Sequence, residues 1–434
     1  MKQLYPYQRL GAQFLASRQR ALLGDHMGLG KSVQAICAAK ALNASSLVVA
    51  CPAIARPNWV RELQMWNFTG RCLVQSYDRI TCNRELREEI KAMKPDVMIL
   101  DESQYLKSPK AKRTRAIYGP RCLGDGLVKH AKHVWALSGT PMPNNPTEVW
   151  PMFAALFPTL IPQRLGGDKP LDWFGFLSKY CLYTKHPQFG IQIQGCRRPE
   201  ELRDLLQQCW LRRKPEDVEV DLPPISWATT LIDPKLTGEL REYMRSPEYE
   251  KIQGVVRAAI EKDGNLNIPY LSTIRRLTGL AKAGASAGMI ESELEGGEYK
   301  KIVVFYIHRE VGAQLQEKLG GFGLVRIDGT TPANARQQLI DRFQTDPEVR
   351  VLLGQLKTCG TAINLQGSSQ VVFVESSWTP SDNTQGAKRC HRIGSKNPVF
   401  VRMLTLQGSI DEAVNNVLRR KAAMVSQIED GAKL

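Results

Sequence analysis

A glycine-rich stretch near the start of the chain has the residue types that bind polyphosphates. A short apolar run leads into a turn that ends with Gly28, Gly30, Lys31 and Ser32. Glycine lets the backbone bend so that successive N–H groups point at phosphate oxygens, and the helix N-terminus that follows favours negative charge. Lys31 would then reach the terminal phosphates while the Ser32 hydroxyl holds Mg²⁺. Because Asp25 stands where the strict phosphate-loop pattern has a further glycine, an ordinary glycine-rich turn remains the alternative.

Asp101 and Glu102 form a second group of residues that could take part in catalysis. They directly follow the apolar run 97–100, whose pattern predicts a buried parallel strand. The carboxyl end of such a strand is where open α/β sheets bind ligands. There an aspartate can hold Mg²⁺, and the neighbouring glutamate can polarise an attacking water. Two acids at a strand end are common, but their place downstream of the glycine-rich turn favours the catalytic interpretation.

The charge of the chain favours a polyanionic partner. The 434 residues include 59 Lys and Arg against 43 Asp and Glu, which leaves a formal net charge of +16. A surplus of this size favours nucleic acid over an acidic protein. Lys110, Lys112 and Arg113 lie in a basic run directly after the two acids and are candidates to grip a phosphate backbone. A solvated helix start explains this run equally well.

Arg389 and Arg392 are the basic residues of interest in the second half of the chain. They are three residues apart, so on a helix both guanidinium groups would face one side. Such a pair can stabilise charge on a transferring phosphoryl group. For this segment taken alone, a basic helix face is the alternative.

Several classes of protein are disfavoured by the composition. The ten cysteines include no Cys-x-x-Cys pair and the six histidines are scattered, so neither a disulfide framework nor a zinc site is indicated. No stretch approaches the roughly 18 apolar residues of a membrane span, and the first residues lack a signal-peptide pattern. We therefore expect an intracellular protein that is neither secreted nor membrane-bound.

The predicted elements indicate the fold class α/β, with two doubly wound parallel-sheet domains. Strand-like apolar runs alternate with helical patterns in both halves of the chain. The first domain is expected over residues 1–224, with a helical insertion at about 144–212 and a charged, proline-rich linker at 212–224. The second is expected over 225–434, with a mostly helical insertion at about 225–295 and a closing helix that opens at the capping box 409–412. The second domain has no phosphate loop.

Seven motifs in order resemble those of superfamily-two helicases, specifically the Swi/Snf-like ATPases, and most closely the annealing-helicase (fork-remodelling) branch. They are Tyr7-Gln8, Gly28 to Ser32, Cys51-Pro52, Asp101-Glu102, Ser138 to Pro141, Asn364-Leu365 and Gln385 to Gly394. The similarity covers nearly the whole chain, and the conserved order of the motifs makes it specific. It implies two RecA-like lobes with ATP between them, duplex DNA lying across both lobes, and a C-terminal bracing helix.

The same resemblance implies roles for individual residues. Those expected to bind ATP are Tyr7, Gln8, Gly28, Gly30, Lys31, Ser32 and Gln385. The expected catalytic residues are Lys31, Asp101 and Glu102, with Arg389 and Arg392 as arginine fingers, and Ser32 and Asp101 are expected to hold Mg²⁺. Ser76, Tyr77 and Trp378 fall in segments where the family contacts or approaches DNA. The chain departs from the family pattern at His26, Ser103, Gln104, Ala362 and Ser395, and none of these departures removes a catalytic group.

The function expected from this resemblance is ATP-dependent translocation on double-stranded or branched DNA, including fork remodelling or strand annealing. One alternative is a strand-separating helicase, although no obvious hairpin insertion interrupts the second lobe. Another is a non-enzymatic DNA-binding scaffold, against which intact Lys31, Glu102 and both arginines argue. We expect a bare, monomeric motor associated with DNA inside the cell, and the sequence does not identify its protein partners.

Overall fold

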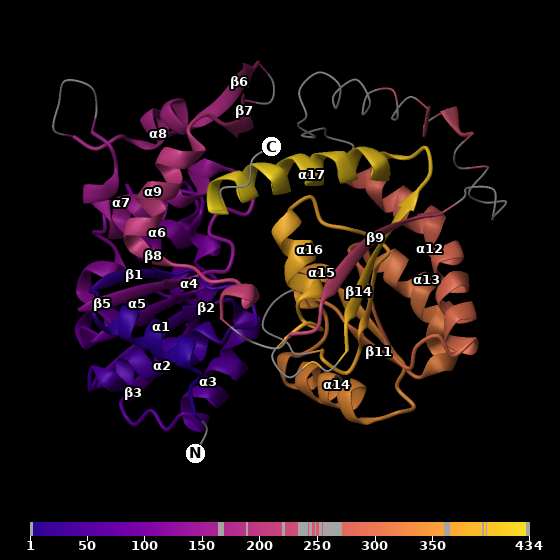
Figure 1. The fold of residues 1–434 in the computed structure, drawn as a ribbon, viewed down its shortest axis with the longest axis horizontal. Helices are drawn as coiled ribbons and strands as arrows, with labels where there is room; N and C mark the ends of the chain where they lie inside the picture. The colour runs from indigo at the N-terminus through magenta and orange to yellow at the C-terminus, as the bar shows by residue number, and fades with distance from the viewer. Residues whose placement is uncertain are drawn as a thin grey trace. The chain divides into compact units, whose positions relative to one another are not determined.

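The computed structural model describes residues 3–163, 169–187, 190–218, 222–232, 271–359, 365–392 and 397–430, together with a few single positions between these ranges. The chain divides into two compact units, which Figure 1 draws as ribbons. The first unit comprises Met1–Tyr183, Gly195–Val220 and Ala423–Leu434, and the second comprises Thr184–Gln194 and Asp221–Ala422. No helix among the described residues is both long and apolar enough to cross a membrane.

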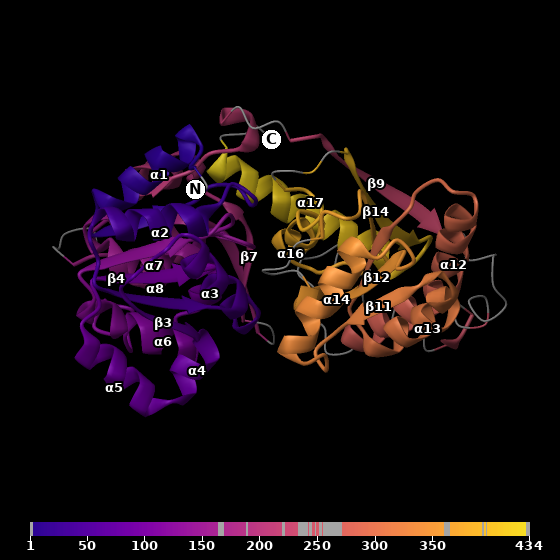
Figure 2. The same cartoon turned by 90° about the horizontal axis from the view of Figure 1, so that it is seen from below.

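The first unit is built on a six-stranded, all-parallel sheet in the order β3-β2-β4-β5-β1-β8. Its strands are β1 (Arg20–Leu23), β2 (Ser46–Cys51), β3 (Arg71–Ser76), β4 (Val97–Asp101), β5 (His133–Leu137) and β8 (Trp210–Leu211). The central strands are almost wholly apolar because helices cover both faces of the sheet. In Figure 2, helices α1 and α2 lie above the strands and α4, α5 and α6 lie below them. The helices are α1 (Pro6–Ala16), α2 (Lys31–Ala41), α3 (Arg56–Met65), α4 (Tyr77–Cys82), α5 (Arg84–Met93) and α6 (Lys112–Tyr118).

The segment expected to be a helical insertion is more varied than its sequence suggests. It contains helices α7 (Trp150–Leu156), α8 (Trp173–Tyr180) and α9 (Pro199–Cys209). It also contains a two-stranded sheet of β6 (Cys181–His186) and β7 (Gly190–Cys196), and it ends in β8, which joins the main sheet beside β1. In β7 the residues Ile191 to Gln194 alternate apolar and polar, which is a strand pattern that the expectation of a helical insertion missed. The buried residue of this strand is Gln192, flanked by half-buried isoleucines.

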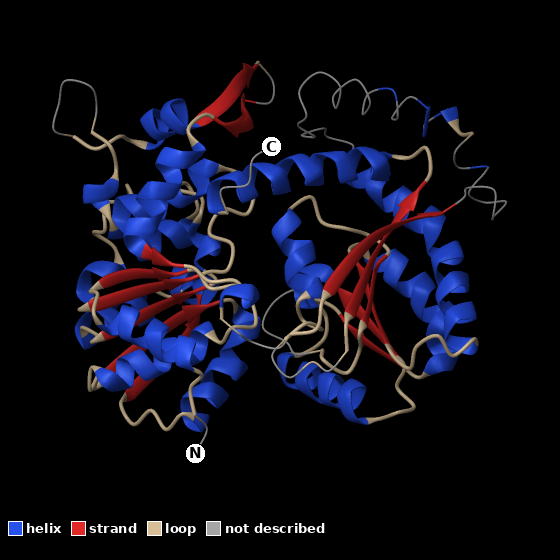
Figure 3. Ribbon diagram, viewed as in Figure 1, coloured by secondary structure: helices blue, strands red, loops and turns tan. Residues whose placement is uncertain are grey.

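The second unit is a second all-parallel sheet, in the order β11-β12-β10-β13-β14-β9. The strands are β9 (Ile225–Ile232), β10 (Ile302–Tyr306), β11 (Leu324–Ile327), β12 (Val351–Gln355), β13 (Gln370–Phe373) and β14 (Val399–Leu406). Helices α12 (Leu271–Glu295) and α13 (Arg309–Leu319) pack on one face. Helices α14 (Ala333–Thr345), α15 (Leu356–Cys359) and α16 (Pro380–Ala387) lie on the other (Figure 1). Figure 3 shows helices flanking both sheets, which confirms the expected fold class of two doubly wound α/β domains.

Strand β9 corrects the expectation of a helical insertion that begins at residue 225. Ile225–Ile232 pairs in parallel with β14 over all eight of its residues and forms the edge of the second sheet. Its isoleucine, threonine and tryptophan side chains suit a pleated surface better than a helix. Most of 233–270 lies outside the described residues, and the helical expectation is met from Leu271 onward by α12.

The closing helix α17 (Ile410–Glu429) begins where its sequence predicts. The Asp411 N–H donates to Ser409 Oγ at 3.1 Å, and the Gly408 N–H donates to Glu412 Oε1 at 3.0 Å. These bonds satisfy N–H groups at the start of the helix. Ile410, Val414 and Leu418 pack in a small apolar cluster of the second unit, and the last turns from Ala423 belong to the first unit.

Candidate nucleotide-binding site

The register of the first sheet brings three chemically important strand ends to the same edge. Strand β5 lies between β1 and β4, and Leu137 of β5 pairs with both Leu23 and Asp101. The glycine-rich turn follows Leu23 directly, and Ser138 follows Leu137. The predicted phosphate loop, the acidic pair and the Ser138 motif therefore start from neighbouring positions.

The loop between β1 and α2 needs glycine at two positions. Gly28 has φ of 89° and Gly30 has φ of 75°, conformations that glycine adopts without penalty. A Cβ at position 30 would also lie 2.5 Å from Gln8 Nε2. Gly30 caps α2, so the open N-terminal turn of this helix faces the loop. Positive φ at glycine and a helix N-terminus after the turn are features of phosphate-binding loops, and phosphate binding by this loop stays a prediction.

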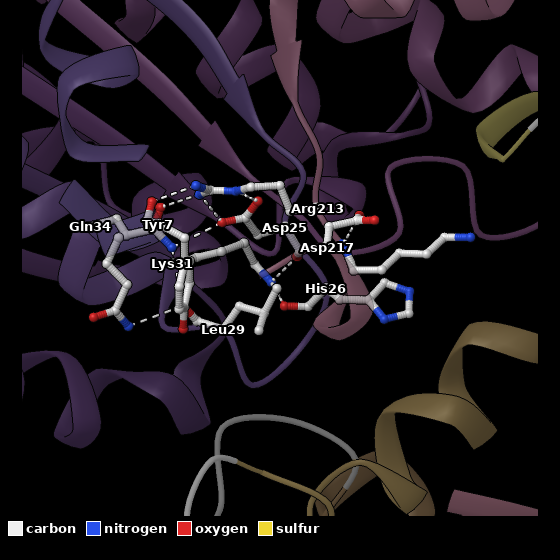
Figure 4. A network of polar contacts seen from close by, with 10 residues as sticks. Tyr7, Asp25, His26, Leu29, Lys31, Gln34, Arg213 and Asp217 are labelled. Carbon is white, nitrogen blue, oxygen red and sulfur yellow. Dashed lines mark hydrogen bonds and ion pairs between the residues drawn. The ribbon is translucent and has the colours of Figure 1, made fainter. Parts of the chain in front are cut away.

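Lys31 and Ser32 are the first two residues of α2. The Lys31 ammonium donates to the carbonyl oxygens of Asp25 at 2.7 Å and His26 at 3.4 Å, as Figure 4 shows. A Cβ at Gly139 would lie 3.4 Å from the same nitrogen. The ammonium therefore lies at the loop and beside the motif that follows β5.

Tyr7 and Gln8 of α1 also border the loop. The Tyr7 hydroxyl and the Gln8 amide nitrogen each donate to the Leu29 carbonyl oxygen at 3.2 Å. Burial, with the nearby charge of Asp25, raises the pKa of Tyr7 to about 12. The structure brings both residues to the predicted nucleotide loop, and their contact with adenine stays a prediction.

Asp101 ends β4 in an environment that disfavours its charged form. The Trp59 indole N–H donates to Asp101 Oδ2 at 2.7 Å, and the Tyr77 hydroxyl donates to the Asp101 backbone oxygen at 2.8 Å. Burial and the charge of Glu102 raise the pKa of Asp101 to about 7, although the Trp59 bond and the charge of Lys31 oppose this rise. A cation bound here would favour the ionised carboxylate.

Glu102 is linked to the motif after β5 through Gln104. Glu102 has φ of 49°, which turns the chain sharply after the strand. Gln104 Nε2 donates to Glu102 Oε2 at 2.7 Å, and Ser138 Oγ donates to Gln104 Oε1, also at 2.7 Å. The Thr140 N–H in turn donates to Ser138 Oγ at 3.1 Å. Gln104, a departure from the family pattern, thus connects the acidic pair to the Ser138 motif.

These donors fit a magnesium–nucleotide complex. The Ser32 hydroxyl and the Asp101 carboxylate are hard oxygen ligands of the type that Mg²⁺ prefers. The absence of a Cβ at Gly30 lets the Gln8 amide come close to the loop, because an added Cβ would lie 2.5 Å from Gln8 Nε2. Among the described residues, no group of three or more His, Cys, Asp or Glu side chains could hold a metal.

The DNA-contact candidates of the first unit differ in exposure. Tyr77 is only 2% exposed, and the Ser76 hydroxyl caps α4 by accepting the Arg79 N–H at 3.2 Å. Both side chains lie inside the unit, and contact between them and DNA stays a prediction. Lys110 and Lys112 are exposed, as a phosphate-binding surface requires. The Arg113 guanidinium lies 5.6 Å from the Tyr105 ring centroid, so this cation also makes a cation–π contact within the unit.

Arg389 and Arg392 do not lie on a helix, which corrects the geometry expected from their spacing. Helix α16 ends at Ala387, and both arginines follow it in turns and bends. The Arg389 carbonyl oxygen accepts from the Leu365 N–H at 2.9 Å, and the Arg392 carbonyl oxygen accepts from Gln366 Nε2 at 3.3 Å and from the Ser395 N–H at 2.8 Å in a turn. The i, i+3 argument for a shared helix face therefore does not apply to this pair.

The remaining candidates of the second unit are Gln385 and Trp378. Gln385 is 5% exposed on α16. Trp378 is half-buried beside the apolar cluster of α12 and α17, and the Arg275 guanidinium lies 4.6 Å from its ring centroid. ATP binding by Gln385 and DNA contact by Trp378 stay predictions. Ala362, Asn364 and Gly394 lie outside the described residues.

One residue of the loop network was not found from the sequence. Arg213 of the predicted linker donates to both carboxylate oxygens of Asp25, although 188 residues separate the two. Local patterns give no signal for a contact at this separation. The run Arg212-Arg213-Lys214-Pro215 is typical of a solvated linker when only its neighbours in sequence are considered.

Comparison with known families supports the interpretation of both units. Residues 68–254 match the SNF2-related domain, and residues 286–394 match the helicase conserved C-terminal domain. The chain therefore joins an SNF2-related domain to a helicase C-terminal domain. This confirms the resemblance to Swi/Snf-like ATPases. The second match includes Arg389 and Arg392, whereas the first begins after the phosphate loop.

Curated SNF2-related proteins align with nearly the whole chain. A SWI/SNF-related matrix-associated actin-dependent regulator of chromatin subfamily A-like protein 1 homolog from Caenorhabditis elegans is 29% identical over 99% of this chain and 62% of its own length. The DNA annealing helicase and endonuclease ZRANB3 from Mus musculus is 28% identical over 99% of this chain and 41% of its own length. The chain thus spans about two fifths to three fifths of these relatives.

Among solved structures, the Sulfolobus solfataricus SWI2/SNF2 ATPase core in complex with dsDNA aligns with 99% of this chain and 94% of its own. The sequence identity is 21% and the TM-score is 0.43.

Proposed function

We propose that this SNF2-related chain is a DNA-dependent ATPase that couples ATP hydrolysis to movement along double-stranded DNA. The observation that carries the proposal is the common edge of the first sheet. There the glycine loop and Lys31 follow β1 while Asp101 and Glu102 follow β4, and both strands pair with β5 between them. An ATPase of this kind needs a phosphate cradle and an acidic pair at one place. The matches to the SNF2-related and helicase C-terminal domains support the same activity.

In the proposed reaction, the loop N–H groups and Lys31 bind the phosphates of ATP. Lys31 would exchange its bonds to the Asp25 and His26 carbonyls for phosphate oxygens. Ser32 and Asp101 would hold Mg²⁺, which would supply positive charge to the phosphates when bound. Glu102 positions and polarises the attacking water, while the bond from Gln104 holds its carboxylate. Arg389 and Arg392 stabilise charge on the transferring group as arginine fingers.

Double-stranded DNA is the proposed partner. The net charge of +16 suits a phosphate backbone, and exposed Lys110 and Lys112 lie in the basic run after the acidic pair. One aligned relative bears the name DNA annealing helicase. We therefore propose fork remodelling or strand annealing as the use of the motor, and a monomer associated with DNA as its working form.

The test is ATP hydrolysis measured without DNA and with single strands, duplex or forked DNA. We expect the largest stimulation with duplex or forked DNA. Hydrolysis that no DNA stimulates would contradict the DNA-dependent part of the proposal. Absence of nucleotide binding by the wild-type chain would contradict the proposal as a whole and would favour a DNA-binding scaffold.

A further inference from the structure

Asp25 is a buried carboxylate placed directly in the phosphate loop. It stands where the strict motif has glycine, and its side chain is completely buried. A buried carboxylate is costly unless it is paired, because the interior solvates charge poorly. An unpaired negative charge at this position would also repel the phosphates of a nucleotide and attract the Lys31 ammonium.

Arg213 supplies the missing positive charge. Its Nε donates to Asp25 Oδ1 at 2.9 Å and its Nη2 donates to Asp25 Oδ2 at 2.5 Å, so the pair is bidentate. Figure 4 shows the guanidinium alongside the carboxylate, while Lys31 is directed to loop carbonyl oxygens. Lys31 thus bonds to backbone oxygen atoms of Asp25 and His26, which are weaker partners than a free carboxylate.

The same guanidinium joins the loop to both neighbouring helices. Its Nη2 donates to Gln34 Oε1 of α2 at 2.9 Å, and its Nη1 donates to the Tyr7 backbone oxygen of α1. Gly11 leaves the space for this contact, because a Cβ there would lie 1.7 Å from Gln34 Oε1 and 2.7 Å from Arg213 Nη2. Arg213 therefore contacts the loop and the two helices, α1 and α2, that border it.

The backbone of the Arg213 segment extends the sheet along the loop. The Gly24 N–H donates to the Leu211 oxygen at 2.7 Å, and the His26 N–H donates to the Arg213 oxygen at 2.9 Å. These bonds continue the parallel pairing of β1 with β8. Because neighbouring side chains of an extended segment point to opposite sides, Arg212 turns away from the loop and pairs with Glu429 at 2.8 Å.

We propose that Arg213 is a positioning residue for nucleotide binding, which neutralises Asp25 and so leaves Lys31 available to the phosphates. This inference rests on the proposed ATPase function. Arg213 acts through Asp25 and Lys31 and not by contact with ATP. Its contribution is therefore electrostatic, and removal of the Asp25 charge should compensate for its loss.

The test uses the full chain and measures the affinity for a non-hydrolysable ATP analogue by calorimetry, with thermal unfolding of each variant. Arg213→Met should weaken binding by about tenfold or more, because it removes the cationic partner of a buried carboxylate that keeps the neutral Gln34 amide as a donor at 3.0 Å. Arg213→Lys keeps the charge but loses the bidentate geometry, so its affinity should lie between those of wild type and Arg213→Met. In Arg213→Met combined with Asp25→Asn, the affinity should return to within about threefold of wild type.

Arg212→Met is the matched control, because it removes the neighbouring buried arginine from the other side of the same segment. It should lower the unfolding temperature without changing the affinity for the analogue. Wild-type-like binding by Arg213→Met would overturn the inference alone. Failure of the double variant Arg213→Met with Asp25→Asn to recover affinity would also overturn the inference. If Arg213→Met alone does not fold, the affinity of this double variant is the deciding measurement. A wild-type chain that binds no nucleotide would overturn the proposed function as well.

Discussion

At the scale of single residues, Lys31 and Glu102 have different tasks at one edge of the sheet. Lys31 lies at the phosphate loop and donates to its carbonyl oxygens, whereas Glu102 follows β4 and is held by Gln104. Loss of the lysine removes attraction for phosphate. Loss of the glutamate charge leaves the shape of the site nearly unchanged and removes mainly the activation of water.

Lys31→Ala and Glu102→Gln should therefore both lower ATP turnover by about a hundredfold or more but differ in binding. We expect Lys31→Ala to weaken nucleotide binding by at least about tenfold, while Glu102→Gln stays near the wild-type affinity. Steady-state hydrolysis and nucleotide titration of the two variants give the comparison. Undiminished hydrolysis by Glu102→Gln would show that the assigned role is wrong.

The residues of the site were accessible to sequence analysis to different degrees. The glycine loop, Lys31 and the acids after β4 could be predicted because each is defined by a few consecutive residues at a strand end. The partnership of Arg213 with Asp25 could not, because it depends on how β8 pairs with β1.

At the scale of elements, the errors of prediction have physical causes. Strand β9 follows a charged, proline-rich run and precedes a helical pattern, so its own β-branched residues were outweighed by its surroundings. The spacing of Arg389 and Arg392 suits a helix, but α16 ends at Ala387, and the Arg389 carbonyl oxygen accepts from the Leu365 N–H of a distant segment. Elements with a strong local signal were predicted correctly. Examples are β10, which is a continuous apolar run, and the start of α17, which has a capping box.

The basic run before and within α6 carries an element-scale prediction about DNA. Replacing Lys110, Lys112 and Arg113 together by glutamine should weaken DNA binding to a similar extent for all sequences. The logarithm of the DNA-binding constant should also depend less steeply on the logarithm of the salt concentration. The magnitude of this slope should fall by about 2 to 3, because each lost phosphate contact lowers it by about 0.9. Fluorescence titrations at several salt concentrations measure both quantities.

A matched control neutralises three exposed cations outside that run, at Arg84, Arg121 and Lys129. This control changes the net charge equally but should leave most of the affinity and slope intact. Equal losses in the two triple variants would assign the effect to net charge, and the basic run would then have no special role.

The last turn of α17 carries a prediction about pH. Burial raises the pKa of Glu429 from its ordinary 4.5 to about 7, with Asp430 acting in the same direction and Arg212 and Lys214 opposing. Arg203, which also faces this turn, donates to backbone oxygens of the helix. The folded chain binds the proton of Glu429 more tightly than the unfolded chain does. The contribution of this proton to the free energy of unfolding is therefore complete below about pH 4.5 and is lost as pH rises through about 7.

Glu429→Gln should remove this loss, since glutamine does not titrate. Between pH 4.5 and pH 8, the stability of wild type relative to the variant should fall, by about 3 kcal/mol at most for the full shift. Urea unfolding of both proteins across this range provides the measurement. If the two unfolding free energies changed in parallel with pH, Glu429 would titrate normally.

At the scale of the whole molecule, each unit carries only part of the proposed catalytic set. The phosphate loop and the acidic pair belong to the first unit, and Arg389 and Arg392 belong to the second. An arginine finger contributes about a thousandfold or more to phosphoryl transfer without being needed for ground-state binding. We therefore expect DNA to act on the step in which the two units cooperate.

Arg389→Ala and Arg392→Ala should each remove most DNA-stimulated hydrolysis while ATP and DNA affinity stay within a few-fold of wild type. Arg419→Ala, at an exposed position of the second unit, is the control and should hydrolyse ATP normally. Hydrolysis rates at saturating ATP and duplex, with separate binding titrations, distinguish these effects. If DNA stimulated hydrolysis by Arg389→Ala and Arg392→Ala as strongly as hydrolysis by wild type, these arginines would have no catalytic role.

The central claim is movement along intact duplex, and displacement of a third strand from a DNA triplex tests it most directly. The wild-type chain with ATP should release the third strand and leave the duplex paired, whereas Lys31→Ala or omission of ATP should release none. ATP hydrolysis without release of the third strand would contradict translocation. Separation of the duplex itself would identify the chain as a strand-separating helicase instead.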